Sequence, residues 1–352
     1  MRDVGASSEV LNVAVVGCGY WGPNLIRNFA SLPQCRVSHV CDINHERLSR
    51  MHEQYPKARA TSRFEDIMSD STVDAVVVAT PPETHFPLAK SALLAGKHVF
   101  VEKPLALSSG HCRELMQLAA DMRRVLMPGH TYVYHPAVIK IKEIIDSGLL
   151  GELLHVRSQR LSFGLFQTGV DVAWDLAPHD LSIILYLLGR NPTGVSSQGF
   201  GHLVDQRDDT VSMMLHFEES LSVHLHCSWL SPVKTRQMVF IGTRAMLLFD
   251  DIEAESKLRV YEKRVECSPI TGLNGRLEFA YSSDGEYVLE TAVGEPLLAE
   301  CTRFADCILA GAKPTSNAAD ALQVIQILEA SAGSRAQGGM RVAPVFDEVA
   351  VL

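Results

Sequence analysis

The sequence lacks the features that mark several large classes of protein. It has no CxxC pair among its eight cysteines, and three consecutive basic residues occur nowhere in its 352 residues. No apolar run approaches the roughly 18 residues that a membrane-spanning helix needs, and the opening MRDVGASSEV is not the apolar core of a signal peptide. Nucleic-acid-binding proteins carry clustered basic residues, and small secreted domains are rich in disulfides. We therefore expect a cytoplasmic protein with reduced, mostly buried cysteines, no nucleic-acid partner and no membrane association.

The composition is that of an ordinary globular protein. Hydrophobic residues make up 47% of the chain and charged residues 21%, which excludes a disordered or low-complexity protein. A chain of 352 residues exceeds what one compact core usually needs and favours two domains. The formal charge of −9 still allows a phosphorylated ligand, because local arginines and helix N-termini can bind phosphate on an acidic protein.

Strands and helices alternate in the first third of the sequence. Short apolar runs rich in β-branched residues predict buried parallel strands at 12–16, 36–41, 74–79, 98–101 and 125–127. Helices are expected between these strands, the clearest at 84–95 and 108–122. This alternation implies right-handed βαβ crossovers and an α/β fold with a doubly wound parallel sheet over roughly residues 10–128.

The pattern changes after residue 128. Apolar helices are expected at 136–147, 178–188, 296–310 and 317–332. Successive strand-like runs between 193 and 261, joined by short turns, predict an α+β domain with an open, mostly antiparallel sheet and helices on one face. Residues 263–292 are polar and weakly patterned, so a loop or insertion is expected there.

A complete GxGxxG stands between the first expected strand and the first expected helix. It reads Gly17-Cys18-Gly19-Tyr20-Trp21-Gly22, and Asp42 ends the next strand. Glycines let the backbone approach a pyrophosphate, the helix N-terminus stabilises its charge, and the carboxylate would accept hydrogen bonds from an adenosine ribose. The alternative is a tight structural turn and an ordinary strand-end aspartate, but the strand–loop–helix context favours a dinucleotide site. Asp42 would repel a 2′-phosphate, which favours NAD over NADP, and Arg47 is the nearest basic residue that argues the other way.

Lys103 directly follows the expected strand HVFVE, at the end of the sheet where doubly wound folds bind ligands. Beside a nicotinamide, its ammonium would stabilise negative charge that develops on a substrate oxygen. The alternative is a surface lysine in the turn before Pro104. Glu102 is expected either to position Lys103 and the cofactor or to form a simple ion pair with the lysine.

Asp175 and His179 are four residues apart at the start of the apolar helix, so they project to one side of it. Pro178 is acceptable there if it lies in the first turn. Histidine suits general acid–base catalysis because its pKa is near neutrality, and the aspartate could orient it or contact a second substrate hydroxyl. The alternative is a capping aspartate and a histidine packed at a helix start.

Three further basic residues on later strands have alternative interpretations. Arg160 is either a cofactor or substrate contact or an arginine on the face of the sheet. Lys234 and Arg236 alternate along one strand, so they either bind a substrate phosphate or line a solvated face.

Three histidines are also placed to share one face of neighbouring strands, namely His216, His224 and His226. No cysteine or carboxylate stands near them at the spacing of metal ligands, so we expect no metal site.

With these residues in view, the sequence resembles the Gfo/Idh/MocA oxidoreductases, the family of glucose–fructose oxidoreductase and inositol dehydrogenase, over nearly its whole length. The resemblance rests on the glycine loop and on Ala79-Thr80-Pro81-Pro82-Glu83-Thr84-His85, Glu102-Lys103-Pro104 and Trp174-Asp175-Leu176-Ala177-Pro178-His179-Asp180. It implies a Rossmann domain at 1–128 and a substrate-binding and oligomerisation domain at 129–352, whose C-terminal helices can pack back on the first. Because the family's second sheet often forms subunit contacts, it also implies a homodimer or homotetramer.

The resemblance also assigns roles to residues. Catalysis falls to Lys103, Asp175 and His179. The candidate cofactor contacts, taken from the resemblance and from the residues themselves, are Gly17, Gly19, Tyr20, Trp21, Gly22, Asp42, Thr80, Pro81, His85, Glu102, Lys103, His130 and Arg160. The candidate substrate contacts are Lys103 and Tyr134 together with Lys234 and Arg236, the last two from their alternation along one strand. His85 has an alternative role as a helix-start residue. Many relatives have an asparagine in the stretch that reads Tyr132-Val133-Tyr134-His135-Pro136 here, which leaves the roles of Tyr134 and His135 open.

We therefore expect an NAD-dependent dehydrogenase that acts on a secondary hydroxyl of a sugar, sugar nucleotide or cyclitol. The substrate class follows from the resemblance alone. Three alternatives remain: a ketoreductase of deoxysugar biosynthesis, an enzyme that oxidises its substrate transiently and regenerates NAD, and a non-catalytic NAD-sensing regulator. The presence of all three candidate catalytic residues argues against the regulator.

Overall fold

The computed structural model describes residues 10–269 and 276–346, which fall into two compact units. Of the described residues, the first unit contains those at 10–134 and 294–326, and the second contains those at 135–293 and 327–346. The first unit thus extends past the expected boundary at 128 and takes up a segment close to the C-terminus. Within the described ranges, no helix is long and apolar enough to cross a membrane.

Six parallel strands form the sheet of the first unit, in the order β3-β2-β1-β4-β5-β6. The strands are β1 (Leu11–Val16), β2 (Cys35–Cys41), β3 (Arg59–Thr61), β4 (Ala75–Val78), β5 (His98–Glu102) and β6 (Leu126–Gly129). Almost every side chain of the central strands β1 and β4 is buried, as expected for a parallel sheet covered on both faces. The strand order and uniform direction confirm the predicted doubly wound parallel sheet.

Local sequence signals explain where the helices of this unit begin. The helices are α1 (Gly22–Ser31), α2 (His45–Gln54), α3 (Phe64–Ser69), α4 (His85–Leu94), α5 (Ser109–Asp121) and α8 (Pro296–Leu309), with short turns η1 (Pro82–Thr84) and η2 (Thr131–Tyr134). Pro23 lies in the first turn of α1, where its missing N–H costs little. The side chains of Asn44 and Ser108 cap α2 and α5 by accepting hydrogen bonds from backbone N–H groups in the first turns.

Helix α8 joins this unit through an aromatic cluster, although it lies almost 170 residues after β6 in the sequence. Phe304 of α8 packs edge-on against Phe29 of α1 and Phe100 of β5, with ring centroids 6.1 and 5.7 Å apart. All three rings are completely buried. The cluster therefore makes α8 part of the core of the first unit.

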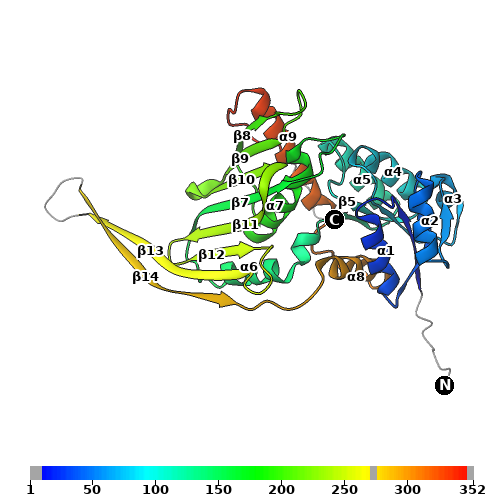
Figure 1. The fold of residues 1–352 in the computed structure, drawn as a ribbon, viewed down its shortest axis with the longest axis horizontal. Coiled ribbons are helices and arrows are strands. Elements are labelled where there is room, and N and C mark those ends of the chain that lie inside the picture. The colour runs from blue at the N-terminus through cyan, green and yellow to red at the C-terminus, as the bar shows by residue number, and fades with distance from the viewer. Residues whose placement is uncertain (1–9, 270–275, 347–352) are drawn as a thin grey trace, which may run out of the picture. The chain divides into compact units, whose positions relative to one another are not determined.

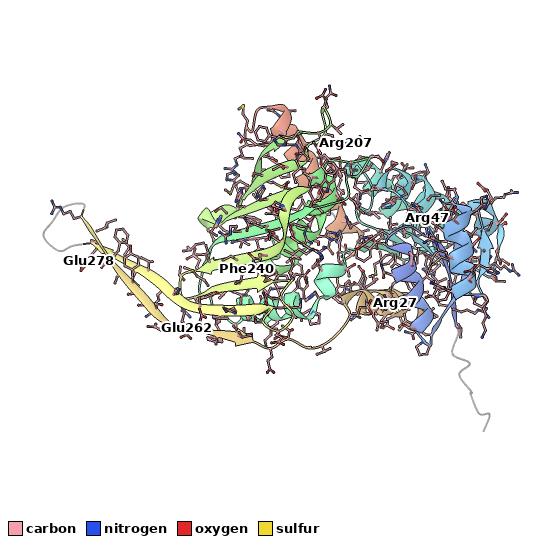
Figure 2. The ribbon with its side chains drawn as sticks, in the orientation of Figure 1. Arg27, Arg47, Arg207, Phe240, Glu262 and Glu278 are labelled. Atoms are coloured by element: carbon pink, nitrogen blue, oxygen red, sulfur yellow. The ribbon has the colours of Figure 1, made fainter. Side chains whose placement is uncertain are left out.

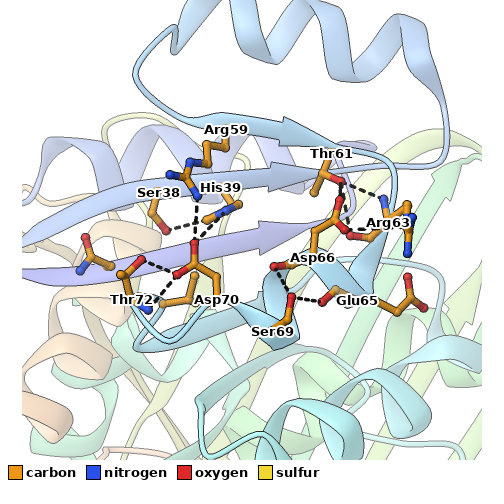
Figure 3. Close-up of polar contacts among 12 residues, drawn as sticks. Ser38, His39, Arg59, Thr61, Arg63, Glu65, Asp66, Ser69, Asp70 and Thr72 are labelled. Carbon is orange, nitrogen blue, oxygen red and sulfur yellow. Dashed lines mark hydrogen bonds and ion pairs between the residues drawn. The ribbon is translucent and has the colours of Figure 1, made fainter.

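Polar contacts fix the edge of the same sheet (Figure 3). Asp70, after α3, accepts hydrogen bonds from the backbone N–H and the hydroxyl of Thr72 and forms an ion pair with Arg59 of β3 at 3.2 Å. These hydrogen bonds, above all those from Thr72, lower the pKa of Asp70. The network lies on the far side of β2 from β1 and stabilises the edge strand.

Eight strands form the sheet of the second unit, in the order β14-β13-β12-β11-β7-β10-β9-β8 (Figure 1). They are β7 (Leu153–Phe163), β8 (Gly194–Phe200), β9 (Thr210–His216), β10 (Ser222–Ser228), β11 (Leu230–Gly242), β12 (Met246–Asp250), β13 (Leu258–Pro269) and β14 (Leu277–Leu289). Only the β7–β10 pair is parallel, which confirms the predicted mostly antiparallel sheet.

Helices cover one face of this sheet. They are α6 (Pro136–Asp146), α7 (Val172–Leu188) and the second half of α9 (Ala318–Ala336). The side chains of β10 show the two faces: Val223, Leu225 and Cys227 are buried on the side of α7, whereas His224 and His226 on the opposite face stay half-exposed. We call this second side the outer face of the sheet.

Two expectations from the sequence were wrong. Residues 263–292 are not a loop: β13 and β14 pair as an antiparallel ribbon over most of this stretch, and residues 270–275 lie outside the described residues. The ribbon is exposed on both faces, so its sequence lacks the alternation of a half-buried strand. Helix α7 also begins at Val172, capped by Asp171, which places Pro178 in the helix interior rather than in the first turn.

Candidate functional site

The three glycines of the GxGxxG loop differ in the contacts that a side chain would make at each position. A side chain on Gly17 would meet the carbonyl oxygen of Ala79 at 2.5 Å, and its φ of +94° also favours glycine. A side chain on Gly22 would overlap the carbonyl oxygen of Gly17. Gly19 has nothing closer than Arg47, 3.8 Å away. Contacts inside the protein thus explain why residues 17 and 22 are glycines. At position 19 no internal contact requires a glycine, but a ligand that approaches the loop closely would.

Asp42 holds this loop against the end of β2. Its Oδ2 accepts a hydrogen bond from Cys18 N at 2.6 Å and its Oδ1 one from Asn44 N at 2.7 Å, and the side chain is buried. A carboxylate offers about four lone-pair positions, so each oxygen retains capacity for a further donor such as a ribose hydroxyl. Exposed Arg47, on α2, lies beside the loop (Figure 2). A carboxylate and a guanidinium therefore both lie near the glycine loop.

Two adjacent aromatic side chains project from the same loop. Tyr20 is 78% exposed and Trp21 39% exposed, and their rings meet edge to face with centroids 5.6 Å apart. The first turn of α1, which follows them, carries no acidic residue, so the positive end of the helix is not neutralised.

His85 connects the loops that follow β4 and β5. Its Nε2 lies 2.8 Å from the carbonyl oxygen of Thr80 and its Nδ1 lies 2.7 Å from that of Pro104. Burial lowers its pKa, against the opposing effect of the two carbonyls. A neutral imidazole has one N–H, so only one of these carbonyls can accept a hydrogen bond at a time. The ring atoms are directed at the protein, which makes His85 a brace between the Thr80-Pro81 loop and the Lys103-Pro104 turn.

Lys103 follows β5 at the carboxyl edge of the parallel sheet and is half-buried. Its backbone N–H donates to Oε2 of Glu102 at 3.3 Å, and the peptide bond between Lys103 and Pro104 is cis. Burial raises the pKa of Glu102 to about 7, although Lys103 opposes the shift. The lysine thus stands next to a carboxyl group that is partly protonated at neutral pH.

A second buried carboxyl group, Glu300 of α8, was not found from the sequence. It accepts a hydrogen bond from the Thr131 hydroxyl at 2.6 Å. Burial raises its pKa well above the usual range, and the charge of Glu102 raises it further. No local motif pointed to Glu300, because it reaches the first unit only through the long-range return of α8.

His130 and Tyr134, expected to contact cofactor and substrate, are buried within the first unit. Nδ1 of His130 lies 2.8 Å from the Ser316 hydroxyl, and burial lowers the histidine pKa to about 4. Burial raises the pKa of the Tyr134 phenol. Both side chains pack towards segments that return from the C-terminal part of the chain.

In the second unit, helix α7 carries Asp175 and His179 one turn apart, and both are half-buried. Oδ2 of Asp175 accepts a hydrogen bond from the indole N–H of Trp229, a fully buried residue between β10 and β11, at 3.1 Å. The role of Trp229 was also missed, since nothing near it in the sequence relates it to α7. Pro178 has no N–H, so the carbonyl of Trp174 lacks its usual helical donor.

Arg160 lies on the covered face of the sheet, in a buried ion pair with Asp180. Its Nε and Nη2 donate to Oδ1 of Asp180 at 3.0 and 2.6 Å, and both side chains are almost completely buried. Asp180 directly follows His179 in α7. The pair therefore fixes the helical turn that carries His179.

The remaining basic candidates lie elsewhere in the second unit. Arg236 forms an ion pair with Asp251 at 3.4 Å, and Lys234 is exposed. His224 and His226 lie on the outer face of the sheet. Among the described residues, no group of three or more His, Cys, Asp or Glu side chains is arranged to hold a metal ion.

A hollow of about 570 Å³ lies at the opposite edge of the first sheet, away from Lys103. It is lined in part by Leu11 and His98, which begin β1 and β5. The Lys97 ammonium beside it donates to the carbonyl oxygens of Asp70 and Val73, both at 2.7 Å. Doubly wound folds bind their ligands at the carboxyl edge, so we do not assign this hollow to the candidate site.

Comparisons with known proteins match both units. Residues 11–130 match the model of the oxidoreductase family with an NAD-binding Rossmann fold, GFO_IDH_MocA, and residues 138–248 match the GFO/IDH/MocA C-terminal domain. The UDP-N-acetylglucosamine 3-dehydrogenase of Acidithiobacillus ferrooxidans is 30% identical over 205 residues, which are 58% of this chain and 63% of that protein. The inositol 2-dehydrogenase 2 of Saccharopolyspora erythraea is 32% identical over 186 residues, 51% of this chain and 54% of that protein.

These two matches therefore span little more than half the length of the curated relatives. A solved structure, GenD2 from gentamicin A biosynthesis in complex with NAD, is similar over nearly the whole chain. It has a TM-score of 0.80 and 26% identity, and the match covers 95% of this chain and 96% of that one.

Proposed function

Because the chain belongs to the Gfo/Idh/MocA family of NAD-binding oxidoreductases, we propose that it transfers hydride between a nicotinamide dinucleotide and a secondary hydroxyl of a sugar, sugar nucleotide or cyclitol. The observation that carries the proposal is Gly19, a glycine that no contact inside the protein requires. It stands in a strand–loop–helix unit beside Asp42, as a site for a dinucleotide would demand.

The residues of the loop fit such a cofactor. The backbone at Gly19 and the N-terminus of α1 would hold the pyrophosphate, and the free lone pairs of Asp42 would accept the ribose hydroxyls. NAD is the proposed cofactor, because the Asp42 carboxylate would repel the 2′-phosphate of NADP. Arg47 opposes this preference, so the choice is a balance between two nearby charges.

Three side chains are proposed to perform the chemistry, while the bound nicotinamide supplies a hydride acceptor. His179 takes the proton from the substrate hydroxyl as general base. Lys103 binds the same oxygen and stabilises the negative charge that develops there. Asp175, held by Trp229, orients the imidazole of His179.

The substrate class rests on the names of the relatives, which include a sugar-nucleotide dehydrogenase and an inositol dehydrogenase. We further propose that the chain forms a homodimer or homotetramer through the outer face of its second sheet, whose side chains remain half-exposed.

The test is a screen of sugars, nucleotide sugars and cyclitols at fixed enzyme concentration, with NAD and NADP in parallel and NADH absorbance as the readout. The proposal expects turnover that Lys103→Ala and His179→Ala each reduce by at least 100-fold. Lys90→Ala, which removes a half-exposed lysine paired with Glu114, is the matched control and keeps full activity.

Other results would overturn parts of the proposal. Substrate loss without net NADH would indicate transient oxidation with regeneration of NAD. Binding of NAD without turnover of any substrate in either direction would indicate a regulator. Undiminished turnover in either alanine variant would refute the assigned roles.

A further inference from the structure

The β13–β14 ribbon extends away from the rest of its sheet (Figure 2). Its register gives it one apolar and one polar face there. We call residues 263–269 and 277–283 the arm. Cross-strand partners share a face, and the pairs on one face are Val265 with Tyr281, Cys267 with Phe279, and Pro269 with Leu277. The pairs on the other face are Arg264 with Ser282, Glu266 with Ala280, and Ser268 with Glu278.

The apolar face is left open to solvent by this chain. Tyr281 is 78% exposed, Leu277 54%, Phe279 53% and Val265 51%. On the polar face, by contrast, Arg264 forms hydrogen bonds within the ribbon itself. It donates to Asp284 at 2.8 Å and to Glu266 at 3.2 Å.

Among the described residues, no further strand pairs with the arm. β12 pairs with β13 only up to Tyr261, and β14 is the last strand of the sheet. A two-stranded ribbon is marginally stable in water unless a third strand or a packed surface supports its apolar face. No described part of this chain supplies that support, so a surface on another molecule is the natural candidate.

We propose that the arm packs its apolar face on a second copy of this chain, in a twofold dimer in which each copy contributes one arm. The inference deepens the assembly proposed above and rests on it. It assigns to residues 263–269 and 277–283 a role in holding two copies together.

The exposed area favours a second copy over an unrelated protein. An aromatic side chain presents 150–250 Å², so the four most exposed apolar side chains together offer on the order of 400 Å². One arm on a foreign protein would bury about 800 Å² in total, below the ~1,200–2,000 Å² of specific interfaces. A twofold axis repeats every contact, and two arms with the surfaces they cover bury roughly 1,600 Å².

The net charge of the arm is compatible with a second copy of this chain as its partner. Lys263 and Arg264 balance Glu266 and Glu278, so the arm carries no net charge. Two identical arms therefore do not repel one another. Surfaces that bind anionic lipid or nucleic acid carry an excess of basic residues, which the arm lacks.

Cys267 provides a native probe of this contact. It lies in the middle of the apolar face and is the one exposed cysteine of the eight. The rate of its reaction with a maleimide is measured across a dilution series, with the oligomeric state followed in parallel by sedimentation velocity. The proposal expects at least tenfold slower labelling in the assembled protein, with the rate of a free thiol restored on dilution.

The variants Tyr281→Asp and Phe279→Asp place a charge on the apolar face, and Ser282→Asp places one on the polar face of the same strand, opposite Arg264. The first two should dissociate the twofold contact and make Cys267 reactive at all concentrations. Ser282→Asp should behave as wild type. Unchanged melting temperature and NAD binding would show that each variant is folded.

Two results would overturn the inference. If the wild-type chain assembles but the apolar-face variants assemble equally well with Cys267 still reactive, the arm is not a contact while the proposed assembly stands. If the wild-type chain is monomeric at tens of micromolar, both the arm contact and the proposed assembly fail. Turnover is measured separately, so neither result bears on the proposed reaction.

Discussion

The indole N–H of Trp229 donates to Oδ2 of Asp175 over 3.1 Å, which ties a buried residue of the second sheet to helix α7. Trp229→Phe keeps most of the packing and removes this donor. A lost hydrogen bond to a charged group costs about 1.5 kcal/mol, so we expect kcat to fall roughly tenfold. The KM for NAD should stay within twofold, because Trp229 lies in the second unit. Steady-state kinetics of the variant and the wild type measure both parameters. An unchanged kcat would show that the hydrogen bond from Trp229 to Asp175 has no part in the proposed mechanism.

Replacing single glycines of the GxGxxG loop should separate ligand binding from folding. Gly19→Ala introduces a methyl group that meets only Arg47, so the melting temperature should stay within 1–2 °C while the affinity for NAD falls at least tenfold. Gly22→Ala creates an overlap with the carbonyl of Gly17 and should lower the melting temperature by several degrees even without ligand. Differential scanning fluorimetry with and without NAD measures both effects. Equal losses of stability would show that Gly19 is a structural glycine after all.

Removing Arg160 should destabilise the second unit rather than weaken ligand binding alone. Arg160→Leu leaves the buried carboxylate of Asp180 unpaired, and breaking a buried ion pair costs about 3–5 kcal/mol. The double variant Arg160→Leu, Asp180→Leu should recover much of that loss, since neither charge then remains buried. Urea unfolding of the single and double variants measures this. A single variant of normal stability with a raised KM would instead support the role in cofactor or substrate binding.

Glu102 should make the free energy of unfolding fall as the pH rises towards neutrality. Its pKa is raised from 4.5 to about 7 by burial, so the folded chain binds this proton more tightly than the unfolded chain. The contribution of Glu102 to stability is therefore complete below about pH 4.5 and is lost as the pH rises to about 7. One pKa unit corresponds to 1.36 kcal/mol, which makes the loss on the order of 3 kcal/mol.

The comparison of wild type with Glu102→Gln measures that contribution together with its effect on Glu300, whose pKa the charge of Glu102 raises. His130, whose pKa burial lowers to about 4, shifts stability in the opposite direction in both proteins. Denaturant unfolding between pH 5 and 8 should give a steeper fall with rising pH in wild type than in the variant. Parallel profiles would mean that Glu102 does not titrate in this range.

The elements that could be predicted are those whose burial leaves a local pattern. β1, β4 and β5 are continuous apolar runs, and the glycine loop stands between an apolar strand and a helix, the context expected of a dinucleotide site. The β13–β14 ribbon was missed because both of its faces are exposed, so period-two alternation carries no burial signal. Pro178 misled the prediction of where α7 begins, because proline is common in first turns and the cap at Asp171 lies seven residues earlier.

In the candidate site, too, only residues that stand in a local sequence motif could be predicted. Lys103, Asp175 and His179 stand in short motifs and could be named from the sequence. Trp229 and Glu300 act through contacts between segments 54 and 169 residues apart in the chain, as the hydrogen bonds to Asp175 and Thr131 show. Arg160 and His85 could be located but not interpreted, since only the structure shows that their polar atoms are directed at Asp180 and at two backbone carbonyls.

The aromatic cluster of the first unit constrains how the chain can be made. Phe29 and Phe100 leave the ribosome early, but their partner Phe304 follows only after the whole second sheet has been synthesised. At roughly 5–20 residues per second, the wait between β6 and Phe304 lasts about 10 to 35 seconds. During that time the nascent first unit presents an apolar surface with no cover. We therefore expect the yield of this protein to depend on translation speed and chaperone supply as well as on its final stability.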